Sequence, residues 1–224
     1  MLASPTSPDQ DPPSPTGVPA VVTTATPPVA KRVVVLVSGA GSNLGALLER
    51  SYNGEVVRVV SDQPGAGGLA LARAHDIDAV AVDHRQYADR SEWEKGLREV
   101  VAEAAAELVV LAGFMRILSG AFVRRWPTLN VHPSLLPAFP GAHAVADALR
   151  HGVKVTGATV HFVVEQVDAG PIVAQESVAV MANDTIETLH ARIKAVEHRL
   201  LPECVALFCS DRLAVDGRQV RILP

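Results

Sequence analysis

Residues whose side chains could bind a ligand or catalyse a reaction gather in three short segments. The one that most favours catalysis is Asn130-Val131-His132-Pro133. It ends an apolar run, and alternate residues of an extended segment share one face. Asn130 and His132 would therefore point the same way, where an amide N–H could stabilise an oxyanion and an imidazole could move a proton near neutral pH. The alternative is a strand-end Asn and His that make only local hydrogen bonds. The loop that follows contains Pro133 and Pro137, which would make it stiff, and this favours the functional interpretation.

The second segment, Gly39-Ala40-Gly41-Ser42-Asn43-Leu44, follows the first apolar run of the chain. Small residues let the backbone approach a ligand, and the free N–H groups of the next helix would suit a phosphate monoester. The segment is not the dinucleotide fingerprint, because Leu44 replaces the third glycine, nor a P-loop, because no Gly-Lys-Ser/Thr follows. An ordinary Gly-rich turn capped by Ser42 or Asn43 fits equally well.

The third segment runs from His161 to Ile172 and carries Asp168 beside Gly170 and Pro171. A carboxylate here could orient a catalytic histidine. Asp, Gly and Pro are also ordinary turn residues, and local chemistry alone favours the turn. Arg116 is the charged residue in an otherwise apolar segment, so its side chain either extends to the surface or lines a pocket.

Other kinds of site are not indicated. The eight histidines show no paired ligand spacing, so we expect no zinc site. A Gly-x-Ser-x-Gly nucleophile motif is absent from the sequence. Cys204 and Cys209 lie in one apolar stretch and are predicted to be buried free thiols of a reducing compartment.

Composition narrows the class of protein. The chain is 48% hydrophobic, which allows a sizeable core, and its net charge of −4 lacks the basic surplus of a nucleic-acid binder. Its apolar runs are strand-sized, far short of the ~20 residues that a membrane span needs. We therefore expect a cytoplasmic globular protein that binds neither nucleic acid nor membrane.

The chain divides near Lys31. Residues 1–30 hold eight of the 16 prolines and no basic residue, which predicts a disordered extension. Residues 31–224 are predicted to form a single domain.

This domain alternates strand and helix signals. They predict an α/β fold with a Rossmann-like, mostly parallel sheet, helices on both faces, and antiparallel strands in the C-terminal part. Ser91 with Glu94, and Asp184 with Glu187, are predicted capping boxes, and Asp216-Gly217 a hairpin turn. The predicted strands are 33–37, 56–60, 78–82, 108–112, 129–131, 156–164 and 172–180; the helices are 43–50, 68–75, 91–106, 121–125, 142–151 and one from 184 to about 202 or beyond. Ligands of such sheets bind at the carboxyl ends of the strands, where all three segments fall.

Taken together and in order, several motifs resemble the folate-dependent glycinamide ribonucleotide formyltransferases of purine synthesis. The motifs are SGAGSNL (38–44), LAGFMRIL (111–118), NVHPSLLP (130–137), PGAH (140–143), GATVHF (157–162) and DAGPI (168–172). The resemblance covers roughly residues 32–223, and the combination is specific although no single piece is.

The resemblance implies direct transfer of the formyl group of 10-formyltetrahydrofolate to the amine of glycinamide ribonucleotide, without a metal. Asn130, His132 and Asp168 match the catalytic trio, in which Asn130 and a protonated His132 would stabilise the oxyanion and Asp168 would orient His132. Residues implied to bind the nucleotide are Gly41, Ser42, Asn43, Glu197, His198, Arg199 and Leu200. Residues implied to bind the folate are Arg90, Met115, Arg116, Ile117, Leu118, Asn130, Val164, Glu165, Gln166, Val167 and Asp168.

Alternatives remain at this stage. A formyltetrahydrofolate hydrolase shares the Asn-x-His and Asp-x-Gly-Pro elements; the Gly41-Ser42-Asn43 loop and the lack of an N-terminal regulatory domain argue against it. A methionyl-tRNA formyltransferase would carry a C-terminal tRNA-binding domain, and a non-enzymatic folate binder would not need an intact trio. Ala138 stands where many members of this family carry a basic residue, and Val145 stands where some carry a second histidine, so the resemblance implies no nucleotide contact for either. The sequence leaves open whether the chain forms a homodimer.

Overall fold

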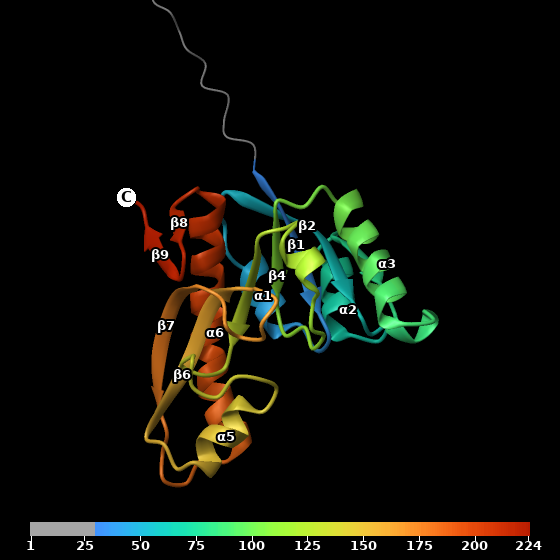
Figure 1. Cartoon of the computed structure of the whole chain (residues 1–224). Coiled ribbons are helices and arrows are strands. Elements are labelled where there is room, and N and C mark those ends of the chain that lie inside the picture. The colour runs from blue at the N-terminus through green and yellow to red at the C-terminus, as the bar shows by residue number, and fades with distance from the viewer. Residues whose placement is uncertain (1–29) are drawn as a thin grey trace, which may run out of the picture.

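The computed structural model describes residues 30–224, whose helices surround a seven-stranded sheet (Figure 1). The extension predicted to be disordered, residues 1–30, lies outside this range except for Ala30. The strands are β1 (Lys31–Val37), β2 (Gly54–Ser61), β3 (Asp78–Ala81), β4 (Leu108–Leu111), β5 (Thr128–His132), β6 (Val155–Phe162), β7 (Ile172–Ala179), β8 (Leu213–Asp216) and β9 (Gln219–Ile222). The helices are α1 (Ser42–Leu48), α2 (Gly67–Ala74), η1 (His84–Gln86), α3 (Arg90–Glu103), α4 (Gly120–Val123), α5 (Ala144–Arg150) and α6 (Ile186–Cys209).

The sheet has the strand order β3-β2-β1-β4-β5-β6-β7. Strands β1 to β5 run parallel, whereas β6 is antiparallel to β5 and β7 is antiparallel to β6. This confirms the predicted α/β fold with its antiparallel C-terminal part. The strand order reverses between β1 and β4, and such a switch point opens a ligand crevice at the carboxyl ends of the strands.

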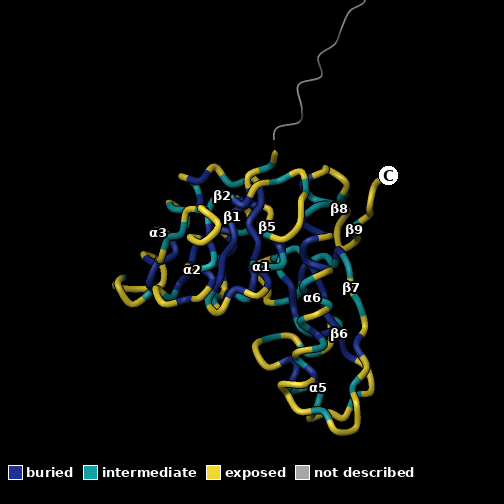
Figure 2. The backbone as a smooth tube through the Cα atoms, turned by 180° about the vertical axis from the view of Figure 1, so that it is seen from behind, coloured by how far each residue is buried: buried dark blue, intermediate teal, exposed yellow. Residues whose placement is uncertain are grey.

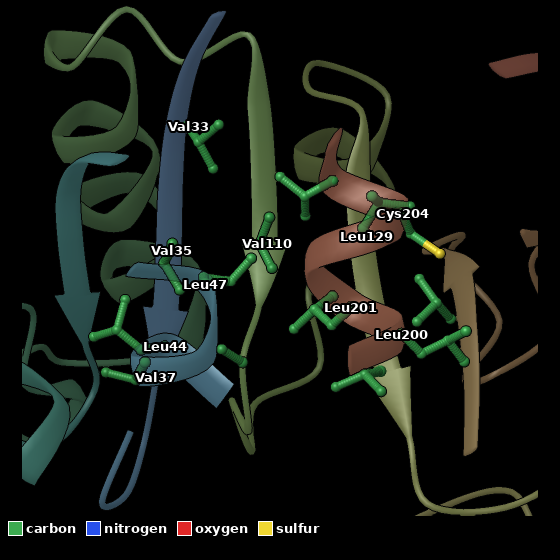
Figure 3. Close-up of a cluster of buried hydrophobic side chains, with 14 of the residues drawn as sticks. Val33, Val35, Val37, Leu44, Leu47, Val110, Leu129, Leu200, Leu201 and Cys204 are labelled. Atoms are coloured by element: carbon green, nitrogen blue, oxygen red, sulfur yellow. The ribbon is translucent and has the colours of Figure 1, made fainter. Parts of the chain in front are cut away.

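Strand β1 suits an interior position in the sheet, between β2 and β4, because its side chains from Val33 to Val37 are apolar on both faces. Val33, Val35 and Val37 pack with residues of α1, α2 and α6 (Figure 3). Val34 and Leu36 pack on the opposite face with residues of α3 and α4. Figure 2 shows the result, with buried strands between exposed loops at both edges of the sheet.

Two helices begin at residues other than the predicted caps. Asp89, not Ser91, caps α3 and accepts from the backbone N–H of Glu92, while Glu94 accepts from the N–H of Ser119 at 3.0 Å. Thr185, not Asp184, caps α6 in a capping box with Thr188. Both predicted capping boxes are therefore wrong, because in each case a neighbouring residue has the extended backbone that a cap requires.

The C-terminal hairpin, β8 and β9, turns at Gly217-Arg218, since Asp216 still pairs with Gln219. The predicted Asp-Gly turn is thus displaced by one residue, and Gly217 supplies the positive φ of 58°. The hairpin returns the chain to the start of β1: Lys31 pairs with Asp211, and the N–H of Leu223 donates to the carbonyl of Arg212 at 2.8 Å. Both ends of the described chain therefore lie at the amino ends of the parallel strands.

We expect Leu201→Ala to lower the free energy of unfolding by roughly 3 kcal/mol. Leu201 is fully buried on α6 within the cluster that covers one face of the sheet, so truncation removes apolar contact and leaves a cavity. Urea unfolding followed by circular dichroism measures the change. The exposed Met181→Ala serves as control and should stay within about 0.5 kcal/mol of the parent chain. Equal stabilities for the two variants would contradict this packing.

Candidate active site

Strand β5 presents Asn130 and His132 on one face of the sheet. Leu129 and Val131, which alternate with them, pack into the core on the face covered by α1, α2 and α6. Asn130 lies opposite His161 of β6, and its Nδ2 is 3.2 Å from the Nε2 of that histidine. The shared face that the alternation predicts is therefore present.

Asp168 joins these groups from the loop between β6 and β7. Its Oδ2 lies 3.5 Å from Nδ1 of His132, and its Oδ1 lies 3.7 Å from Nε2 of His161. The N–H of Gly141 donates to the same Oδ2 at 2.7 Å. The backbone of Asp168 has a φ of 51°, an unusual conformation for a residue other than glycine. The structure thus brings the three predicted catalytic residues together and adds His161 to them.

His132 is held at both ring nitrogens. Its Nε2 lies 2.8 Å from the carbonyl oxygen of Phe139, which can only accept, so this nitrogen carries a proton. Its Nδ1 faces the Asp168 carboxylate. A doubly protonated ring can donate on both sides, and this arrangement suits a histidine that acts as a cationic donor.

The Gly-rich loop lies where β1 passes into α1. Gly41 precedes the helix with a φ of 82°, and a Cβ there would lie 2.7 Å from the Cα of Gly68. Only glycine therefore allows this loop to rest on α2. Ser42 is exposed, whereas Asn43 is buried and its Nδ2 donates to Oε2 of Glu197 at 3.1 Å. Burial raises the pKa of Glu197, although the hydrogen bond from Asn43 opposes the shift.

Of the other predicted nucleotide contacts of α6, two have side chains that lie in other contacts. Leu200 packs in the hydrophobic core, and Arg199 pairs with Glu176 of β7. His198 is half-buried. The structure therefore brings Glu197 to the Gly-rich loop but does not bring the side chains of Leu200 and Arg199 there.

A pocket of about 440 Å³ lies beside the loop that follows β4. Four of the residues predicted to bind the folate line it: Arg90, Met115, Arg116 and Ile117. Met115 and Ile117 are 71% and 55% exposed, so they offer apolar surface to a ligand in this pocket. Leu118 differs, because its side chain is buried in the core with α3 and α4.

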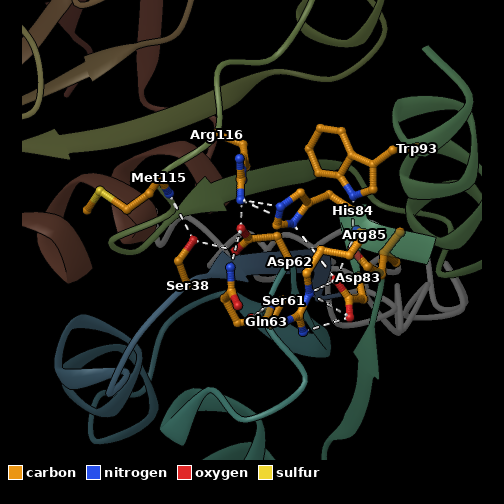
Figure 4. A network of polar contacts seen from close by, with 11 residues as sticks. Ser38, Ser61, Asp62, Gln63, Asp83, His84, Arg85, Trp93, Met115 and Arg116 are labelled. Atoms are coloured by element: carbon orange, nitrogen blue, oxygen red, sulfur yellow. Dashed lines mark hydrogen bonds and ion pairs between the residues drawn. The ribbon is translucent and has the colours of Figure 1, made fainter. Parts of the chain in front are cut away.

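Arg116 is anchored by a buried carboxylate (Figure 4). Its Nε donates to Oδ2 of Asp62 at 2.8 Å, and Oγ of Ser38 donates to Oδ1 of the same carboxylate at 2.6 Å. The backbone N–H of Met115 donates to the Ser38 hydroxyl. Arg116 is thus both a pocket wall and part of an ion pair that ties three strand ends together. The sequence analysis missed Asp62, although it follows β2 directly and the strand-end rule applies to it.

Replacing Asp62 by Asn should lower the free energy of unfolding at pH 7 by roughly 2 kcal/mol. Burial opposes ionisation, but the hydrogen bonds from Ser38 and Arg116 prevail and hold the pKa of Asp62 below its ordinary 3.8. A carboxylate with a lowered pKa stabilises the fold above the ordinary value, and this stability is lost as the pH falls further. The difference between variant and parent should therefore shrink below about pH 4. Urea unfolding between pH 7 and pH 3 measures it, and a constant difference would contradict this origin.

The loop predicted to cover the folate, Val164 to Asp168, is largely exposed. Val164 and Val167 are 37% and 45% exposed, and Glu165 pairs with Arg124 at 3.5 Å. Arg218 of the C-terminal hairpin donates to the carbonyl of Ala169 at 2.9 Å. The loop is thus fixed at two points, while Val164, Gln166 and Val167 remain accessible to a ligand.

Within residues 30–224, no group of three or more His, Cys, Asp or Glu side chains has an arrangement that could hold a metal ion. None of the helices in this same range has the length and apolar character needed to cross a membrane. Cys204 and Cys209 are buried and free, as predicted, and burial raises the pKa of Cys204 to about 12.

Comparison with known proteins places this geometry in context. A family model described as formyl transferase matches residues 31–205. The phosphoribosylglycinamide formyltransferase of Mycobacterium tuberculosis is 45% identical over 86% of this chain and 91% of its own. The trifunctional purine biosynthetic protein adenosine-3 of Gallus gallus is 47% identical over 82% of this chain but only 19% of its own, so the chain spans about a fifth of that relative's length. Among solved structures, glycinamide ribonucleotide transformylase 1 from Symbiobacterium toebii superposes with a TM-score of 0.84 at 46% identity, covering 87% of this chain and 94% of its own.

Proposed function

Since the chain belongs to the formyl transferase family, we propose that it transfers the formyl group of 10-formyltetrahydrofolate to the amine of glycinamide ribonucleotide, a step of purine synthesis. The observation that carries the proposal is the convergence of Asn130, His132 and Asp168. Strand β5, which carries the first two, is parallel to β4 and β1, so it ends at the same edge of the sheet as the strands that precede the pocket at Arg116 and the Gly-rich loop. Residues 31–224 would form one catalytic domain, acting in the cytoplasm.

The residues present suit both substrates. The Gly-rich loop offers backbone N–H groups at Gly41 and Ser42 to a phosphate, and the Glu197 carboxyl beside Asn43 can accept from sugar hydroxyls. The pocket at Met115 and Ile117 offers apolar surface to a pteridine or benzoyl ring, with arginines nearby for carboxylates.

The folate supplies an activated formyl group, and the chain's own residues supply the donors. As the substrate amine adds to the formyl carbon, negative charge develops on the formyl oxygen. The Asn130 amide would donate to it, and the Nε2–H of the His132 imidazolium would donate to it in exchange for its present contact with the Phe139 carbonyl. Asp168 would hold His132 in place and help to move a proton toward the departing folate nitrogen. This route needs neither a metal nor a covalent enzyme intermediate.

The test is to mix the purified protein with 10-formyltetrahydrofolate and follow tetrahydrofolate formation by absorbance, with and without glycinamide ribonucleotide. Turnover that requires the ribonucleotide would support the transferase. Equal turnover in its absence would identify a formyltetrahydrofolate hydrolase and overturn the proposal. Omitting added metal and including a chelator in a parallel assay tests whether the reaction is metal-free.

A further inference from the structure

His161 occupies the centre of the site without a role in the proposed chemistry. It lies on β6 directly opposite Asn130, and only 1% of its surface is exposed. Both of its ring nitrogens have polar neighbours. The Nδ1 atom is 2.9 Å from the carbonyl oxygen of Phe162, and Nε2 is 3.2 Å from Nδ2 of Asn130.

These two contacts define the protonation of the ring. A carbonyl oxygen only accepts, so Nδ1 of His161 must carry a proton. An amide nitrogen only donates, so Nε2 must be the unprotonated acceptor. The contacts are satisfied together by one form of the ring, the neutral tautomer with its proton on Nδ1.

The surroundings favour this neutral form. Burial is the largest influence and lowers the pKa of His161 below its ordinary 6.5. Two titratable groups face the ring, and they act in opposite directions. The Asp168 carboxylate favours a charged ring, whereas a charge on His132 disfavours it.

We propose that His161 is a positioning residue that holds the amide of Asn130 through its Nε2 lone pair. One N–H of Asn130 is engaged by His161, and the second N–H of the same nitrogen remains to donate to the reacting oxygen. The inference rests on the proposed function for its catalytic consequence, but not for the tautomer. Without the acceptor on His161, the Asn130 side chain could rotate, and its second N–H would no longer be held toward the reacting oxygen. This loss would raise the energy of the transition state more than it would weaken substrate binding.

Two substitutions separate the two contacts of His161. His161→Gln places a carbonyl oxygen near the position of Nε2, so it keeps an acceptor for Asn130 and gives up the bond to Phe162. His161→Asn places an amide N–H near the position of Nδ1, so it keeps the bond to Phe162 and gives up the acceptor. The second variant is therefore the matched control for the first.

We expect His161→Asn to lower kcat about tenfold while both KM values stay within about twofold, because one hydrogen bond to a catalytic donor is lost. His161→Gln should retain kcat within about threefold of the parent protein. Thermal melting of both variants checks that they are folded. Unchanged kcat in His161→Asn, or equal losses in both variants, would overturn the proposal.

A second measurement does not depend on activity. Imidazole ¹⁵N resonances of the full chain report the protonation of each ring nitrogen, and His161→Gln identifies the His161 signals. At pH 7 we expect the neutral form with the proton on Nδ1. A proton on Nε2, alone or in addition, would overturn the proposal. If the parent protein gives this tautomer but transfers no formyl group, the proposed function fails and the arrangement of His161 with Asn130 stands.

Discussion

His132→Ala is expected to fold normally and to lose turnover by about a thousandfold, because it removes both a charged donor and a proton carrier. His132 is 5% exposed and contacts only its site neighbours Phe139 and Asp168 through its polar atoms, so the loss is concentrated in the chemistry. The kcat for tetrahydrofolate formation in the presence of glycinamide ribonucleotide measures the effect, alongside thermal melting.

The exposed His75→Ala, at the end of α2, is the control and should keep full activity. Parent-like turnover in His132→Ala would remove this residue from the mechanism. Loss of activity together with loss of folded protein would instead show that His132 is needed for the structure.

Gly170→Ala should strongly lower activity and also destabilise the fold. A Cβ at Gly170 would lie 1.7 Å from the carbonyl oxygen of Phe162, where β6 and β7 come together, so the backbone must move. Relieving the contact shifts the loop that holds Asp168, only two residues away. We expect a loss of about 1–3 kcal/mol in stability, typical of overpacking, and a fall in kcat of about a hundredfold through the displaced carboxylate.

Thermal melting and kcat measure both effects. Gly65→Ala is the matched control, because a Cβ there meets no atom within 4 Å, and both quantities should remain unchanged. A Gly170→Ala protein with parent-like melting and turnover would contradict the close approach of Phe162.

Much of this site follows from sequence because its signals are local. Asn130 and His132 are two apart on one strand, and alternation alone puts them on one face. Gly41 is needed where the chain turns from β1 into α1, because the backbone has a positive φ there. The position of Asp168 could be assigned only by resemblance, since its chemistry is also that of a turn.

What the sequence did not reveal depends on register and side-chain direction. His161 becomes a neighbour of Asn130 only through the pairing of β5 with β6, and no local pattern predicts which residues of two strands lie opposite. Leu118 and Leu200 belong to segments predicted to bind ligands, yet their side chains fill the two cores. The prediction of the helix caps was wrong for a similar reason. Asp89 and Thr185 lie close to other residues that could cap a helix, and the backbone conformation decides which of them does so.

The Lys31–Asp211 pair at the amino ends of the parallel strands has a consequence for how this domain can be joined to others. The pocket at Arg116 follows β4 at the opposite edge of the sheet, so Lys31 and Asp211 lie at the edge away from it. We expect an affinity tag attached after Pro224 to start at this edge and to leave the pocket uncovered. The same geometry suits a modular chain in which this unit is one of several, as its match to a fifth of the chicken trifunctional protein illustrates.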